Sequence, residues 1–313
     1  MIVSSAIYRT ITVVRCKIDL IMKRGVLILF LALFCTTNLI KAQTKRALVI
    51  GIGQYEDSAW DKINGDKDIP YVLGFLNEAN YEQVITLVNE QATKGNIISA
   101  FAALTEECKP NDIVYIHFSG HGQQMKDRNK DEADAIDECW IPYDAYRVPS
   151  AKYRGEKHLV DDEVNILLTK IRHKIGDGGK MLVAIDTCFS GDSTRETADD
   201  EVFTRGVEDI FEIAKSLLRK TQSEDNLDIS ANIEQWISLS ACQSDQVNSE
   251  MTTPMVGKLT YALSKIIKNK NVCDNNEFFK QLTKFVNSNT KSHAQKPTMT
   301  GDTERYNITD ILR

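Results

Sequence analysis

The stretch DIVYIHF at residues 112–118, followed by SGHG at 119–122, is an apolar, β-branched run that ends in small residues and His121. A second run, KMLVAI at 180–185, leads into DTCFSG and Cys188. Nearly continuous apolar runs of this length are typical of parallel strands buried on both faces of a sheet. Sequential strands are often neighbours, and ligand sites gather at the carboxyl ends of strands in open α/β sheets. His121 and Cys188 are therefore expected to converge.

Strands and helices alternate along the rest of the chain. Further apolar runs predict strands at 46–52, 82–88 and 235–239. Helical periodicity predicts helices at 66–79, 96–108, 161–174, 256–268 and 276–288, with Thr93 as the N-cap of the second. This alternation predicts an α/β fold with a mostly parallel sheet and helices on both faces.

Two stretches interrupt the alternation. Residues 127–157 are dense in charge, and residues 192–232 form a polar, acidic insert. Both exceed the usual connection of about four to six residues, so each is expected to be functional or mobile.

Composition and charge restrict the class of protein. The 313 residues are 42% hydrophobic and 26% charged, which excludes collagenous, disordered and polytopic membrane proteins. Without residues 1–42, the chain holds 32 basic and 43 acidic side chains. This acidic balance predicts basic partners and gives no electrostatic reason to bind nucleic acid or anionic lipid.

The amino-terminal segment has the pattern of a targeting signal. A basic Met22-Lys23-Arg24 precedes the apolar run Val26–Cys35, and Ala42 offers a small-residue cleavage site. Residues 1–42 are therefore interpreted as a signal peptide, with residues before Met22 as an over-called start. The run is short for a membrane span of roughly 20 residues. A secreted or periplasmic protein without a stable membrane anchor is expected, with residues 43–313 as its folded domain.

Five cysteines remain after the signal: Cys108, Cys139, Cys188, Cys242 and Cys273. An odd number in an exported protein leaves at least one free thiol, which is a candidate nucleophile. No two of the five form a CxxC pair, which argues against a zinc site.

A thiol and an imidazole at one sheet edge point to nucleophilic catalysis. Cys188 is the candidate nucleophile and His121 the proton carrier, with glycines beside each allowing close backbone approach. The backbone N–H groups of Gly122 and Cys188 are the candidate oxyanion donors. His117 lies inside its strand and is interpreted as a core residue. His158, His173 and His293 fall in charged stretches, where exposure is expected, and receive no role.

HFSGHG together with DTCFSG resembles the histidine and cysteine motifs of the caspase-like cysteine peptidases, most closely the metacaspases and their bacterial members. Supporting matches are Ala47–Ile52, Ile63–Asp68, Val160–Glu163 and Ser238–Asp245. The resemblance implies a caspase-like α/β/α sandwich with a mostly parallel central sheet of about six strands. It also implies a His/Cys dyad and endopeptidase activity that needs no cofactor for the chemistry itself.

The resemblance further implies cleavage after Arg or Lys. Asp186 and Asp68 match the acids of the S1 pocket, and Ser240 and Cys242 match the wall that pairs with the substrate backbone. For Asp186 a physical argument agrees, because a carboxylate two residues before the nucleophile faces the same side and attracts a cationic side chain. Polypeptides with a basic P1 residue are the expected partners, and a monomer is expected.

Many metacaspases require calcium, which makes acidic residues candidate ligands. Asp161 and Asp162 match the acids of the family's calcium site, and Asp137 is a further candidate. The acidic loop does not fit an EF-hand, since it lacks the glycine and terminal glutamate at the required spacing. Solvated acidic faces are the alternative interpretation.

The polar insert, residues 192–232, is longer than expected for a single-chain metacaspase. Its basic residues include Arg195, Arg205, Arg219 and Lys220, which make it a candidate region for self-cleavage. An ordered flap over the site is the alternative. Phe189 also stands where many metacaspases have histidine after the nucleophile.

Two other functions remain open. A catalytically silent caspase-like binding or regulatory module would have the same fold, although both dyad residues are present. A dinucleotide-binding enzyme is suggested by Gly51-Ile52-Gly53, but Glu56 occupies the third glycine position of GxGxxG.

Overall fold

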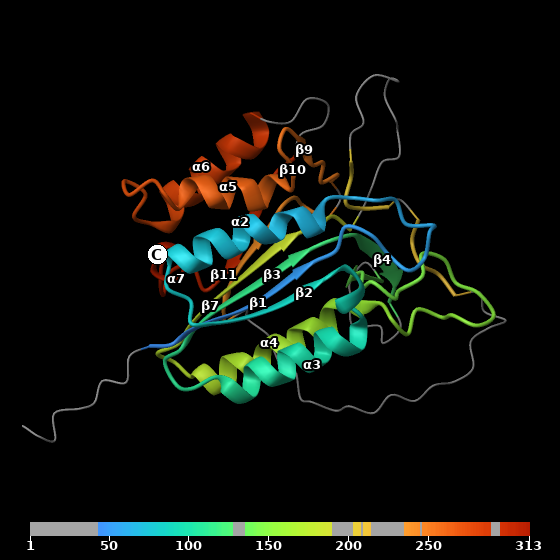
Figure 1. Cartoon of the computed structure of the whole chain (residues 1–313), viewed down its shortest axis with the longest axis horizontal. Coiled ribbons are helices and arrows are strands. Elements are labelled where there is room, and N and C mark those ends of the chain that lie inside the picture. The colour runs from blue at the N-terminus through green and yellow to red at the C-terminus, as the bar shows by residue number, and fades with distance from the viewer. Residues whose placement is uncertain are drawn as a thin grey trace, which may run out of the picture. The chain divides into compact units, whose positions relative to one another are not determined.

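The computed structural model describes residues 43–127, 135–189, 203–207, 209–213, 235–244, 246–288 and 295–313. Its centre is a six-stranded sheet in the order β11-β8-β7-β3-β1-β2 (Figure 1). The strands are β1 (Lys45–Gly51), β2 (Gln83–Val88), β3 (Ile113–Ser119), β7 (Lys180–Asp186), β8 (Ile237–Ser240) and β11 (Thr298–Gly301). Five strands are parallel and β11 is antiparallel to β8. The predicted mostly parallel sheet is confirmed.

Helices cover both faces of this sheet (Figure 1). One face carries α2 (Gly65–Glu78), α5 (Lys258–Ile266), α6 (Asn275–Ser288) and the short α7 (Thr309–Leu312). The other carries α3 (Lys94–Glu107) and α4 (Asp161–Ile175). The side chain of Thr93 accepts a hydrogen bond from the Asn96 backbone and caps α3, as predicted. The α/β/α sandwich is thereby confirmed.

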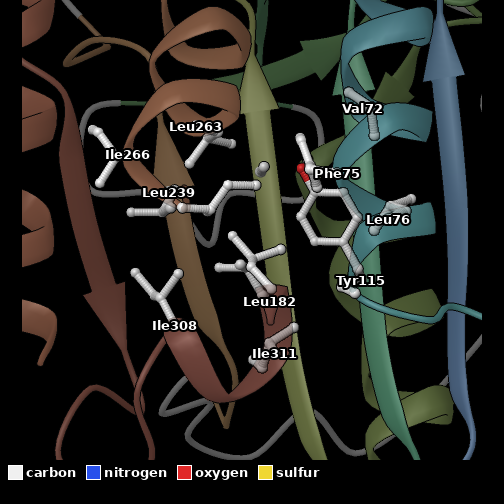
Figure 2. Close-up of a cluster of buried hydrophobic side chains, with 14 of the residues drawn as sticks. Val72, Phe75, Leu76, Tyr115, Leu182, Leu239, Leu263, Ile266, Ile308 and Ile311 are labelled. Carbon is white, nitrogen blue, oxygen red and sulfur yellow. The ribbon is translucent and has the colours of Figure 1, made fainter. Parts of the chain in front are cut away.

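Alternation along the central strands supplies one apolar core to each helix layer. Figure 2 shows Tyr115, Leu182 and Leu239 of neighbouring strands packing against Phe75 of α2 and Leu263 of α5. The intervening residues, such as Val114, Ile116 and Val183, face α3 and α4 on the opposite side. Because both faces are buried, the carboxyl edge of the sheet is where β3 and β7 present side chains to a site.

Several short strands lie outside the central sheet. The charged stretch after β3 contains an antiparallel sheet of β4 (Gly122–Lys126), β5 (Ile136–Trp140) and β6 (Leu159–Val160). The sequence did not predict β5, because its IDECW sequence mixes acids with buried Cys139 and Trp140. A hairpin of β9 (Met251–Thr252) and β10 (Met255–Val256) precedes α5, and a short 3₁₀ helix (η1, Asn89–Gln91) follows β2. Helix α5 begins at Lys258, two residues after the start predicted at residue 256, because Val256 pairs with Met251 in the hairpin.

Thr44–Arg313 form one compact unit. The predicted signal peptide, residues 1–42, lies outside the described residues and stays a prediction. Within the described part of the chain, no helix is long and apolar enough to cross a membrane.

Candidate active site

The two motifs leave the sheet side by side. Strands β3 and β7 are adjacent and parallel, with Ser119 aligned to Asp186 at their ends. A Cβ added to Gly122 would lie only 2.4 Å from the Cys188 carbonyl oxygen, so glycine is required where the two backbones meet. The expected convergence of the motifs is therefore present in the structure.

His121 is buried and held in one orientation. Its Nε2 lies 2.9 Å from the Asp61 carbonyl oxygen, and its backbone N–H donates to the Tyr55 hydroxyl at 2.6 Å. The Trp60 ring stacks on the imidazole at 5.2 Å between centroids. A carbonyl can only accept, so the proton sits on Nε2 and Nδ1 carries the lone pair.

The free nitrogen of His121 has the properties of a base. Nδ1 is buried and makes no hydrogen bond within the described residues. Burial lowers the pKa of His121 to about 4, which keeps the imidazole neutral near pH 7. A neutral imidazole with an unoccupied acceptor can take a proton from a thiol.

Cys188 is fully buried at the end of β7. Its thiol donates to the carbonyl oxygen of Gln246, and the Cys242 thiol donates to the same oxygen at 3.4 Å. The Cys188 side chain is thus directed at the loop that follows β8.

The carbonyl oxygen of Arg205 occupies the position predicted for an oxyanion. The backbone N–H groups of Gly122 and Cys188 donate to this one oxygen at 3.0 and 3.3 Å. The Thr187 hydroxyl adds a third, longer contact of 3.4 Å. Two N–H groups converging on one carbonyl is the arrangement that stabilises a tetrahedral intermediate.

The side chain of Arg205 fills a pocket of three carboxylates. Its Nη1 lies 2.8 Å from Asp68 and 3.3 Å from Asp186, and its Nε lies 2.9 Å from Glu250. Nη1 also donates to the Ser119 hydroxyl. Arg205 and both aspartates are fully buried. Nη2 is buried and makes no hydrogen bond within the described residues. The three carboxylates nevertheless offset much of the cost of burying the guanidinium charge.

The pKa values of the two pocket aspartates are shifted in opposite directions. Burial raises the pKa of Asp68 to about 6, although Arg205 and Ser119 stabilise its charged form. For Asp186, burial is outweighed by the Arg205 charge and by hydrogen bonds from Asn248 and Thr260, which hold its pKa below the usual range. The pocket therefore keeps negative charge at neutral pH and favours a cation.

The backbone around Arg205 is bound as an added strand. The Arg205 N–H donates to the Asn248 carbonyl at 3.0 Å, and the Glu250 N–H donates to the Phe203 carbonyl at 2.9 Å. Thr204 and Ser249 form the antiparallel bridge between them. This is the pattern by which an extended peptide joins an exposed edge.

The predicted substrate wall lies next to this segment. Ser240 pairs with Thr298 of β11, and the buried Cys242 thiol lies 3.7 Å from the Thr187 carbonyl. The backbone partners of residues 203–205 are Asn248 and Glu250, slightly later in the chain. Contact of Ser240 and Cys242 with substrate stays a prediction.

The predicted calcium ligands lie near one another. Asp161 and Asp162 begin α4, and Asp137 lies in β5. Burial raises the pKa of Asp161 to about 7, and the charges of Glu138, Asp162 and Asp137 add to the effect. Among the described residues, however, no group of three or more His, Cys, Asp or Glu side chains could hold a metal ion. Calcium binding by Asp161, Asp162 and Asp137 stays a prediction.

His117 and His158 are both buried. His117 lies inside β3, as expected, with Nδ1 2.8 Å from the Tyr115 hydroxyl. The expected exposure of His158 is wrong. Its nitrogens lie 2.8 Å from the Tyr153 hydroxyl and 2.9 Å from the Gln123 side-chain oxygen, and Phe211 covers its ring. His173 is exposed, and His293 lies outside the described residues.

His117 should make stability depend on pH. Burial lowers its pKa from 6.5 to about 4, so between these values the unfolded chain binds a proton that the folded chain does not. The contribution of His117 to the free energy of unfolding therefore has its full value above pH 6.5. It falls by about 1.4 kcal/mol per pH unit as the pH drops toward 4. His117→Gln should lose this part of the slope. Urea unfolding of both proteins from pH 4.5 to 7.5 measures the difference, and parallel curves would refute it.

Comparisons with known proteins agree with the fold. A family model described as the caspase domain matches residues 44–307. Metacaspase-1 of Plasmodium falciparum is 25% identical over 284 residues, covering 86% of this chain and 41% of that protein. Metacaspase-1B of Aspergillus terreus is 31% identical over 157 residues, covering 47% of this chain and 38% of that protein.

Solved structures show the same architecture. A protein from Geobacter sulfurreducens has a TM-score of 0.58 at 22% identity, covering 86% of this chain and 98% of that one. Caspase-1 from Spodoptera frugiperda has a TM-score of 0.55 at 10% identity, covering 83% and 89%. These likenesses concern the fold alone.

Together these matches place the chain in the class of caspase-like proteins, which includes the metacaspases. Within that class, the chain belongs to the caspase-domain family, peptidase family C14. It spans only 41% and 38% of the two metacaspases described above. A place among the bacterial metacaspases stays a prediction.

Proposed function

We propose that this protein is a cysteine endopeptidase that hydrolyses polypeptides after arginine. The observation that carries the proposal is Arg205, whose carbonyl oxygen accepts from Gly122 and Cys188 while its guanidinium fills the acidic pocket. Both requirements of a P1 residue, a positioned carbonyl and a matched side chain, meet at one residue.

The geometry supports a two-step mechanism. Nδ1 of His121 takes the thiol proton, and the Cys188 sulfur attacks the P1 carbonyl carbon. The N–H groups of Gly122 and Cys188 stabilise the oxyanion, and His121 returns the proton to the leaving amine. Water then hydrolyses the thioester and restores the thiol. The Asp61 carbonyl keeps the imidazole in the required tautomer throughout.

The experiment that tests this function compares matched peptides with Arg, Lys or Asp at P1, using residues 43–313. Hydrolysis should follow the order Arg, then Lys, with no cleavage after Asp, because the pocket acids repel a carboxylate. Absence of hydrolysis of all three peptides by a folded and fully processed protein would favour the silent binding or regulatory module instead.

Calcium activation is proposed alongside, with Asp161, Asp162 and Asp137 as the groups that would contribute ligands. Calcium would neutralise the repulsion among these carboxylates rather than enter the chemistry. Running the same assay with and without calcium tests this. The Asp161→Asn variant should lose any calcium-induced rise in melting temperature.

Glu250 should select arginine over lysine. It binds Nε of the Arg205 guanidinium, a donor that a lysine side chain does not have. Glu250→Gln should therefore lower kcat/KM for Arg peptides about tenfold more than for Lys peptides, since a hydrogen bond to a charged group contributes about 1.5–3 kcal/mol. Glu82→Gln, at an exposed glutamate, is the matched control. Equal losses for both peptides would show that Glu250 does not discriminate.

A further inference from the structure

We propose that Arg205–Gly206 is the peptide bond that this protein cleaves in itself, and that residues 203–207 block its site until that cleavage. The inference rests on the proposed endopeptidase function and assigns it a particular bond. Of the five basic residues in the insert, Arg205 alone lies in the part of the chain that the structure describes.

The segment before the bond is held as a substrate would be. Phe203 and Arg205 exchange backbone hydrogen bonds with Asn248 and Glu250, and the Arg205 carbonyl lies on the two predicted oxyanion donors. Strand pairing, the acidic pocket and the oxyanion donors therefore set the same register independently. A surface arginine that merely met an acid would satisfy only one of them.

The segment after the bond is anchored on the other side of the site. The Phe211 N–H donates to the Gln124 carbonyl at 2.8 Å, and the Lys126 N–H donates to the Phe211 carbonyl at 3.2 Å. The Phe211 side chain is buried against His158 and Tyr153, with its ring 4.5 Å from the His158 imidazole. The Gln123 side chain also donates to the Asp209 carbonyl at 2.9 Å. Anchors on both sides hold the Arg205–Gly206 bond across the site.

Burial makes the cleavage intramolecular. Arg205 and Cys188 are both fully buried, so a second molecule reaches neither the bond nor the nucleophile without displacing the segment. Cleavage should therefore be first order and independent of protein concentration.

The chemistry of the step balances with water as the only co-reactant. The Cys188 sulfur bonds to the Arg205 carbonyl carbon after its side chain turns from Gln246, and the C–N bond to Gly206 breaks. The Gly206 nitrogen takes the proton carried by His121. Water hydrolyses the thioester, leaving a carboxylate on Arg205 and a free amine on Gly206.

The two products should stay together and leave an open site. The first product contains β7 and the second contains β8, which pair within the central sheet. Arg205 loses its covalent link to the Phe211 anchor, so its effective concentration in the pocket falls. The pocket then becomes available to other polypeptides.

The test uses four variants of residues 43–313, each purified and analysed by intact mass over time. Wild type should give the fragments 43–205 and 206–313, which co-elute in size-exclusion chromatography. Cys188→Ala should remain whole. Arg205→Gln should remain whole at this bond, and Arg219→Gln, a matched basic residue of the insert, should be cut like wild type. Arg205→Lys keeps the charge if Arg205→Gln fails to fold, and it should be cut more slowly than wild type.

Peptide hydrolysis by the same samples separates the two proposals. Arg205→Gln should cleave an added Arg peptide without a lag, whereas wild type should show a lag that ends as fragments appear. Cutting elsewhere, no cutting in a protein that cleaves the peptide, or a rate that rises with protein concentration would overturn the Arg205–Gly206 assignment while leaving the endopeptidase function standing. If folded Arg205→Gln and wild type both fail to cleave the peptide, the endopeptidase function itself fails.

Discussion

Cys188→Ala should abolish both peptide hydrolysis and self-cleavage, lowering kcat/KM for an Arg peptide by at least about 10³-fold. The reason is that the Cys188 thiol supplies the bond to the carbonyl carbon, which an alanine side chain cannot form. The fold should survive, because alanine removes one atom from a position at the sheet edge. Hydrolysis rates and far-ultraviolet circular dichroism measure the two effects.

Cys273→Ala is the matched control for this prediction. Cys273 is an exposed thiol, so its loss should leave activity unchanged. If the purified Cys188→Ala protein kept its activity, the nucleophile would have to lie elsewhere in the chain.

Asp186→Asn should lower kcat/KM for an Arg peptide by about 10²–10³-fold. Removing one partner of a buried charge pair costs about 3–5 kcal/mol, and Asp186 lies 3.3 Å from the Arg205 guanidinium. The substitution keeps the shape of the side chain, so the loss comes mainly from charge.

A structural loss must be separated from a loss of specificity, because Asp186 also accepts from the Thr260 backbone at 2.9 Å and from Asn248. A peptide with citrulline at P1 has nearly the shape of arginine without its charge. Asp186→Asn should reduce hydrolysis of the Arg peptide far more than that of the citrulline peptide. Equal reduction of both, with a matching fall in melting temperature, would mark Asp186 as a purely structural acid.

Local sequence signals were enough for the central fold. Strands β1, β3 and β7 are buried on both faces, so their apolar runs were visible without tertiary information. The edge strand β11 was missed, because TMTG is short, half exposed and without an apolar run. Its strand conformation comes from pairing with β8, which is a long-range interaction.

The site was predicted in part for the same reason. His121, Cys188 and Asp186 lie next to strands with strong signals, so their convergence could be inferred. Asp61 and Glu250 come from loops, and only folding brings the Asp61 carbonyl to His121 and the Glu250 carboxylate to Arg205. In the sequence, Glu250 is marked only as an acid five residues after the SACQSD motif. Its place in the arginine pocket becomes clear only from its backbone pairing with Phe203.

The most direct test of the central claim is covalent labelling of the nucleophile by a substrate-like reagent. Peptidyl chloromethyl ketones with Arg or Asp at P1 should be incubated with processed protein, and the labelled residue located by peptide mapping. The account predicts one added group on Cys188 with the Arg reagent, blocked by excess Arg peptide, and no reaction with the Asp reagent. Labelling of another cysteine, or preferential labelling by the Asp reagent, would contradict it.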